Sequence, residues 1–132
     1  MTQMSGAESR LSRDDPPALL AATPKDGLLL VRVVAPQLTA VRSIDRLERE
    51  LTTLLERHEE PRWILDFAGV TFIVTMAISA LLVIMKRLRS KGGDLAIIGL
   101  ETSIYRMFKL MKLDQVFIVA DTREAAQAAL RA

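Results

Sequence analysis

The stretch WILDFAGVTFIVTMAISALLVIMKRLRSKGGDLAIIG, residues 63–99, contains the change of periodicity that decides the fold. It opens with a short apolar run, Trp63 to Phe67, which has the length and composition of a buried strand. Beyond Thr75, apolar residues recur at helical spacing and a Gly-Gly pair follows, where glycine favours a helix C-cap. DLAIIG, residues 94–99, reads again as a buried strand. The stretch therefore predicts a strand, a helix and a second strand.

Upstream of this stretch, the sequence predicts a hairpin and then a helix. Two apolar runs, 18–22 and 28–34, flank the turn-forming residues 23–27. From Ser43, leucine and isoleucine recur every three or four residues with charged residues between them. We therefore expect an amphipathic helix with Ser43 as its N-cap, ended by Pro61.

Downstream, the pattern predicts a third helix, another strand and a last helix. Residues 102–111 form the third helix, with Met107 and Met111 on its inner side beside Ile104 and Phe108. Residues 116–119 form a strand, and 121–124 have a capping-box pattern before an alanine-rich helix. This alternation predicts an α/β fold with a mixed sheet of about five strands and four helices.

Length and composition limit the classes of function. A chain of 132 residues suits one domain, which we place at 18–132 after a flexible lead-in of residues 1–17. There is no cysteine and His58 is the single histidine, so neither a thiolate site nor a histidine cluster can form. Basic residues exceed acidic ones by only 18 to 16, which does not indicate nucleic-acid binding. We expect a cytoplasmic protein with no metal or cofactor.

One alternative concerns the membrane. No residue between Phe67 and Met85 is charged, and a basic segment follows, as in a spanning helix with a positive inner flank. Against this, residues 69–75 combine a glycine with a β-branched series, which favours strand and loop over helix. We therefore expect no membrane span.

The junction FIVTMAIS, residues 72–79, is the candidate functional site. Thr75 is an N-cap of the following helix, a modifiable hydroxyl within an apolar docking patch, or both. Val74, Met76 and Ile73 cannot all point into one core if they straddle a tight junction, so some form that patch or all fill the crevice between sheet and helix. A phosphate on Thr75 would block a desolvated interface at this position.

Residues 63–99, together with IYRMFKLMKLDQVFIVADTREAAQAAL, resemble the STAS family, which comprises anti-sigma factor antagonists and relatives in sulphate transporters. The resemblance covers roughly residues 18 to 131. In that family a loop of aspartate, serine, serine or threonine, and glycine precedes a helix, and an anti-sigma kinase phosphorylates the first serine. Here Val74 stands for the aspartate, Thr75 for the phosphoacceptor and Ala77 for the glycine. Lys112 replaces a glycine that the family places at the end of its third helix.

The resemblance implies a non-catalytic regulator that binds a protein partner, an anti-sigma factor with serine/threonine kinase activity, by partner switching. It makes Thr75 the candidate phosphoacceptor, and an alternative keeps the fold but makes the domain a non-phosphorylated scaffold or an accessory subunit of a stress-signalling complex or membrane transporter. The sequence leaves homo-oligomers open and predicts no direct nucleic-acid contact. The expected partner-binding residues are Ile73, Val74, Met76, Ala77, Ile78 and Ser79.

Two groups of basic residues end the second and third predicted helices. If those helices lie side by side, the groups form a positive patch for an acidic partner or an anionic lipid, and otherwise they are solvated helix faces. The groups are Lys86, Arg87, Arg89 and Lys91, and Arg106, Lys109 and Lys112.

Overall fold

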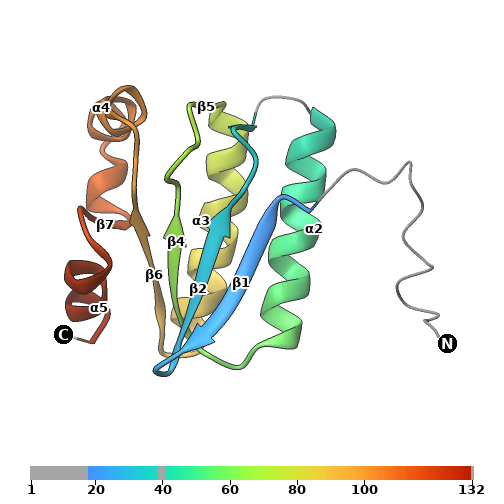
Figure 1. The fold of residues 1–132 in the computed structure, drawn as a ribbon, viewed down its shortest axis with the longest axis vertical. Coiled ribbons are helices and arrows are strands. Elements are labelled where there is room, and N and C mark those ends of the chain that lie inside the picture. Colours follow the sequence, from blue (N-terminus) through green and yellow to red (C-terminus); the bar gives the residue numbers. More distant parts are fainter. Residues whose placement is uncertain (1–17, 39–40, 132) are drawn as a thin grey trace, which may run out of the picture.

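The computed structural model describes residues 18–38 and 41–131 (Figure 1). Five strands form one sheet in the order β1-β2-β4-β6-β7, and β3 pairs with β5 in a separate two-stranded sheet. The strands are β1 Leu20–Lys25, β2 Leu28–Val33, β3 Gln37–Leu38, β4 Arg62–Asp66, β5 Phe72–Ile73, β6 Asp94–Ile98 and β7 Ile118–Ala120. The helices are α2 Val41–Arg57, α3 Thr75–Ser90, α4 Thr102–Leu110 and α5 Arg123–Arg131, with a short 3-10 turn, η2 Leu113–Gln115.

The order of the strands determines where the helices lie. β1 and β2 are antiparallel, whereas β2, β4, β6 and β7 are parallel neighbours that follow the order of the chain. Right-handed crossovers that all step in one direction place their helices on one face of a sheet. Side chains of α2, α3 and α4 accordingly share the main core, and α5 packs on the opposite face (Figure 1). The predicted α/β fold with a mixed five-stranded sheet and four helices is confirmed.

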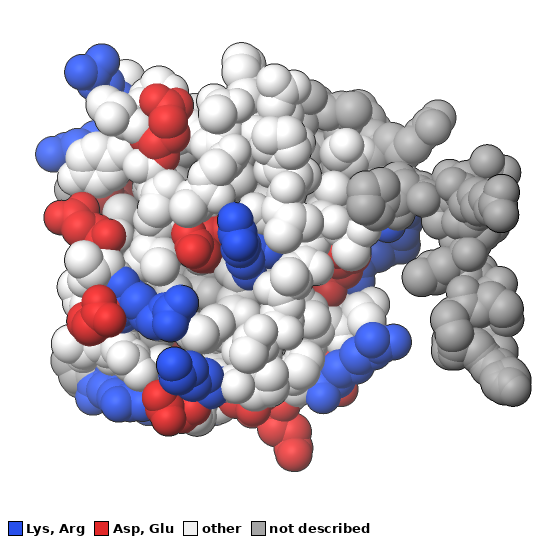
Figure 2. Space-filling view, viewed as in Figure 1, with Lys and Arg blue, Asp and Glu red and all other residues white. Residues whose placement is uncertain are grey.

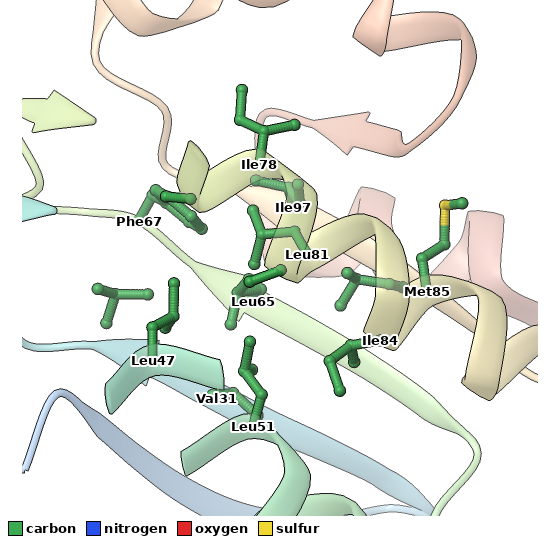
Figure 3. Packing of buried hydrophobic residues seen from close by; sticks show 14 of the residues in the cluster. Val31, Leu47, Leu51, Leu65, Phe67, Ile78, Leu81, Ile84, Met85 and Ile97 are labelled. Carbon is green, nitrogen blue, oxygen red and sulfur yellow. The ribbon is translucent and has the colours of Figure 1, made fainter. Parts of the chain in front are cut away.

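The main core lies between the sheet and the pair α2 and α3 (Figure 3). Successive side chains of a strand point to opposite faces, so Leu65 faces this core while Ile64 packs with Ala126 and Leu130 of α5. Burial on both faces explains why the three central residues of β4, Trp63 to Leu65, are all apolar. The core residues labelled in Figure 3 are Val31, Leu47, Leu51, Leu65, Phe67, Ile78, Leu81, Ile84, Met85 and Ile97.

The first hairpin turns more tightly than the sequence predicts. β1 continues to Lys25, which pairs with Leu28, so the turn consists of Asp26 and Gly27 alone. Their φ angles are 54° and 79°, as a two-residue turn matched to the strand twist requires. Pro24 is tolerated within β1 because β1 is an edge strand and one side of it needs no ladder hydrogen bond.

Two predicted helix starts are displaced. α2 begins at Val41, so Ser43 lies inside the helix and is not its N-cap. The last helix begins one residue later than the capping-box pattern implies, because the Thr122 hydroxyl accepts a hydrogen bond of 3.0 Å from the Ala125 N–H. Thr122 therefore performs the capping that the pattern 121–124 had suggested.

The end of the third predicted helix also differs from expectation. α4 ends at Leu110, and the chain then takes a left-handed turn at Lys112, where φ is 59°. Met111 therefore leaves the inner face and is 45% exposed, whereas Phe108 is fully buried and Met107 is partly buried. The following strand starts at Ile118, two residues later than predicted.

The uncharged run from Phe67 to Met85 divides between a turn, β5 and the first part of α3. In the part of the chain that the structure describes, no helix is long and apolar enough to cross a membrane. The predicted lead-in of residues 1–17 lies outside the described residues, and the boundary at residue 18 stays a prediction.

Candidate functional site

The junction before α3 is held by backbone hydrogen bonds to a distant part of the chain. β5 pairs in parallel with β3, with Ile73 opposite Leu38. The Val74 N–H donates to the Leu38 carbonyl at 3.1 Å, and the Thr71 N–H donates to the Pro36 carbonyl at 2.8 Å. Both flanks of the junction are thus tied to the segment that leads to α2, which fixes where α3 begins.

The turn between β4 and β5 sets the position of this junction above the sheet. The Ala68 N–H donates to the Asp66 carboxylate at 2.8 Å, and Gly69 has a φ of 92°. The end of β6 approaches the same turn closely, since a Cβ atom on Gly99 would lie 2.7 Å from Asp66 Oδ1. Glycine at 99 therefore allows the ends of β4 and β6 to meet beneath the junction.

Thr75 is the first residue of α3 and its side chain is exposed. The N-cap is Val74, in extended conformation with φ −95° and ψ 157°, and no side chain caps the helix. The prediction that Thr75 itself is the N-cap is therefore wrong, because pairing of β5 with β3 starts the helix one residue earlier. The first turn of α3, which Thr75 opens, holds no acidic residue.

Large apolar side chains lie exposed on either side of Thr75. Phe72 and Met76 are each 55% exposed, and Val83, two turns along α3, is 56% exposed. Ser79 is exposed between Met76 and Val83, at the spacing of one helix face. In Figure 2 the region where β3, β5 and the start of α3 lie is nearly free of charged side chains. We call Phe72, Thr75, Met76, Ser79 and Val83 the α3 surface.

The structure divides the predicted partner-binding residues into three groups, which are buried, half-buried and exposed. Ile73, Ala77 and Ile78 are 5%, 0% and 3% exposed and belong to the core, so the expectation that they present side chains to a partner is wrong. Val74 is half-buried and packs against that core. Met76 and Ser79 remain at the surface with Thr75.

Phe72 lies in the predicted junction but is not among the predicted partner-binding residues, and Val83 lies outside that junction; both are at the surface. The alternation of a strand contains the signal for Phe72, because an inward Ile73 implies an outward neighbour. Helical spacing contains the signal for Val83, which lies seven residues after Met76 and so returns to the same face.

The α3 surface offers apolar contact area and two hydroxyls. Within residues 18–38 and 41–131, no group of three or more His, Asp or Glu side chains could hold a metal ion. His58, the single histidine, lies beyond α2 with its Nδ1 3.8 Å from Glu60 Oε1. The arrangement at Thr75 is suited to docking and to modification of a hydroxyl.

Comparisons with known proteins agree with this architecture. The family model described as the STAS domain matches residues 20–126. BtrV of Bordetella bronchiseptica, which carries the name of an anti-sigma factor antagonist, is 30% identical over 87 residues, covering 66% of this chain and 74% of BtrV.

Two solved structures share the fold. An anti-sigma factor antagonist from Mycobacterium paratuberculosis superposes with a TM-score of 0.73 at 19% identity, over 86% of this chain and 93% of the other. The unphosphorylated form of SpoIIAA, an anti-sigma factor antagonist of Bacillus, gives a TM-score of 0.62 at 14% identity, over 85% of this chain and 97% of SpoIIAA. With the family model matching residues 20–126, the chain belongs to the STAS domain family.

Proposed function

We propose that this STAS domain is a non-catalytic cytoplasmic regulator of the anti-sigma factor antagonist type, and that it binds its partner through the α3 surface. One observation carries the proposal: Thr75 lies exposed between Phe72 and Met76, each 55% exposed, where most of the surrounding apolar residues are buried. Exposed apolar side chains that surround a polar group are typical of protein contact sites. The name of BtrV and the titles of several structural neighbours support the class of function.

We further propose that phosphorylation of Thr75 switches this contact off. A phosphate brings roughly −2 charge and would have to be desolvated between Phe72 and Met76 if the partner bound. The domain itself would accept the phosphate, because unpaired N–H groups at a helix N-terminus favour an anion and the first turn of α3 holds no acidic residue. SpoIIAA, which shares the fold, is known in unphosphorylated and phosphorylated forms.

The partner in this proposal is an anti-sigma factor with kinase activity. Intact-mass spectrometry of the protein, incubated with ATP and the anti-sigma kinases of its own cell, tests the modification. We expect a gain of one phosphate, and none for Thr75→Ala. Thr102→Ala is the matched control, since Thr102 is also an exposed threonine that opens a helix but lies outside the α3 surface, so its loss should leave the gain unchanged.

A second candidate function is a scaffold or accessory subunit that keeps the α3 surface but is never phosphorylated. Val74, the residue in place of the family's aspartate, is half-buried against the core and offers a kinase no carboxylate. If the protein gains no mass in a reaction that phosphorylates an antagonist with the family's aspartate, this second function is supported over the first.

A further inference from the structure

A second exposed apolar group lies at the end of α4. Leu110, the last residue of the helix, is 86% exposed, and Met111 after it is 45% exposed. The helix ends here because Lys112 takes a left-handed φ of 59°, which turns the chain away and leaves both side chains protruding. We call Tyr105, Lys109, Leu110, Met111 and Lys112 the α4 tip.

The chemistry of the α4 tip combines apolar ends with cations. Lys109 and Lys112 flank the Leu-Met pair in the chain, and both are exposed. The Lys109 ammonium lies 5.6 Å from the centroid of the Tyr105 ring, and Tyr105 is 39% exposed. Leucine and methionine can enter an apolar phase while lysine stems extend their charges back to its polar boundary.

More positive charge adjoins the α4 tip from α3. The Arg89 side chain donates to the Val116 carbonyl at 2.7 Å, which joins the basic end of α3 to the segment just after η2. Val116 itself is 36% exposed and adds apolar area there. Arg106 on α4, Lys86 and Arg87 on α3, and Lys91 just after α3 are also exposed, and Asp94 is already paired with Arg89 at 3.0 Å. The basic end of α3 is therefore joined to the segment that follows the α4 tip in the chain.

We propose that the α4 tip is a contact site for an anionic lipid membrane. The observations favour a lipid surface because the apolar residues protrude from a helix end, beside a tyrosine and between lysines, which is the composition of segments that lie in the membrane interface. Clustered cations complement anionic headgroups, and the combination of inserted apolar residues with a basic patch supplies two signals for peripheral attachment. The domain would lie on the membrane without crossing it.

Thr75 lies at the end of α3 opposite to the basic residues that adjoin the segment after the α4 tip. Thr75 begins α3 and Arg89 lies near its end, so the rise of a helix separates them by about 21 Å along the axis. A domain attached through the α4 tip would keep the α3 surface accessible to its partner.

Flotation of the purified full chain with vesicles tests the proposal. Vesicles of phosphatidylcholine alone are compared with vesicles that also contain phosphatidylglycerol, at low and high salt. We expect binding to the anionic vesicles only, weakened by salt, and reduced at least about tenfold by the double variant Leu110→Gln and Met111→Gln or by Lys109→Gln with Lys112→Gln. Val83→Gln is the matched control, since Val83 is 56% exposed on α3 and should leave binding unchanged.

Three results would overturn the proposal. Equal binding to both kinds of vesicle would show that charge does not drive binding. A loss of vesicle binding in Val83→Gln as large as that in the α4 tip variants would show that the α4 tip is not the contact site. A chain that floats with neither kind of vesicle also contradicts it and would redirect the search to an acidic protein surface. Circular dichroism of each variant shows that it is folded, as expected for changes at exposed positions.

Discussion

The two ends of α3 are built in opposite ways. At its C-terminus, the Gly92 and Gly93 N–H groups donate to the carbonyls of Arg89 and Leu88, at 3.0 and 2.9 Å, in the pattern of a Schellman motif. At its N-terminus the N-cap is Val74, no side chain caps the helix, and Thr75 and Met76 face outward.

This difference shows that the start of α3 is not stabilised by a side-chain cap. α4 and α5 both begin with a capping side chain, Glu101 and Thr122 respectively, whereas α3 does not. A cap contributes about 1 kcal/mol to a helix. The start of α3 lacks this contribution. It presents exposed apolar side chains and a hydroxyl, as a docking surface requires. Selection for stability alone would not favour this arrangement.

The largest effect is expected at the C-terminal end of α3. A Cβ atom on Gly93 would lie 1.7 Å from the Pro61 carbonyl oxygen, so Gly93→Ala must displace the backbone that leads into β4. We expect a loss of roughly 3 kcal/mol in the free energy of unfolding, measured by urea denaturation. Gly92→Ala is the control, since it meets open space but has a φ of 84°, and should cost about 1–2 kcal/mol. An equal loss in the free energy of unfolding for both variants would show that the close contact with Pro61 is not the cause.

The next effect compares two threonines at helix starts. Thr122→Ala removes the hydroxyl that accepts from Ala125, and we expect a cost of about 1 kcal/mol. Thr75→Ala removes a hydroxyl that caps nothing, and we expect a change below about 0.5 kcal/mol. Thermal or urea unfolding of both variants measures the pair. A cost at Thr75 as large as that at Thr122 would mean that Thr75 serves the fold.

A smaller effect distinguishes the end of α4 from the end of α3. Both helices are followed by a left-handed residue, but α3 uses Gly92 and α4 uses Lys112, at φ 84° and 59°. Because an L side chain is disfavoured in this region, Lys112→Gly should stabilise the domain by roughly 0.5 kcal/mol, after the entropy of the added glycine is subtracted. An increase in the urea midpoint measures it. Destabilisation would show that the lysine side chain contributes contacts that outweigh the backbone strain.

The smallest effect concerns the cap of α4 and depends on pH. Hydrogen bonds from the Ser103 hydroxyl and then from its backbone N–H lower the pKa of Glu101 below its usual 4.5. The ionised cap therefore stabilises the fold above pH 4.5, and this contribution disappears as pH falls through the lowered pKa. Glu101→Gln should be slightly less stable than the original protein at neutral pH, and this difference should disappear in acid. A difference that stays constant with pH would exclude ionisation as its source.

Strand and helix order could be predicted from the sequence because both signals are local. β4 and β6 are apolar runs of strand length, and the Gly-Gly pair marks the end of α3 without reference to anything distant. The left-handed turn at Lys112 carries no such signal, because a lysine occupies the position that normally indicates it.

The start of α3 could not be placed from local signals. Its N-cap is a valine, and the junction is held by the pairing of β5 with β3, two strands of two residues each that lie far apart in the chain. Which apolar residues of the junction are exposed depends on that pairing, so the sequence does not decide which of Ile73, Val74 and Met76 reach the surface. The role of Thr75 as a candidate phosphoacceptor rests on family resemblance, whereas its apolar surroundings single it out locally.

The most direct test of the central proposal is a binding measurement on the α3 surface. Isothermal titration of the cognate anti-sigma kinase would compare the original protein with Met76→Asp and Val34→Asp, two substitutions at apolar residues that are 55% and 49% exposed. We predict that Met76→Asp weakens binding at least about tenfold and that Val34→Asp leaves it unchanged. Undiminished binding by Met76→Asp, with the domain folded, would contradict the assignment of the α3 surface as the contact site.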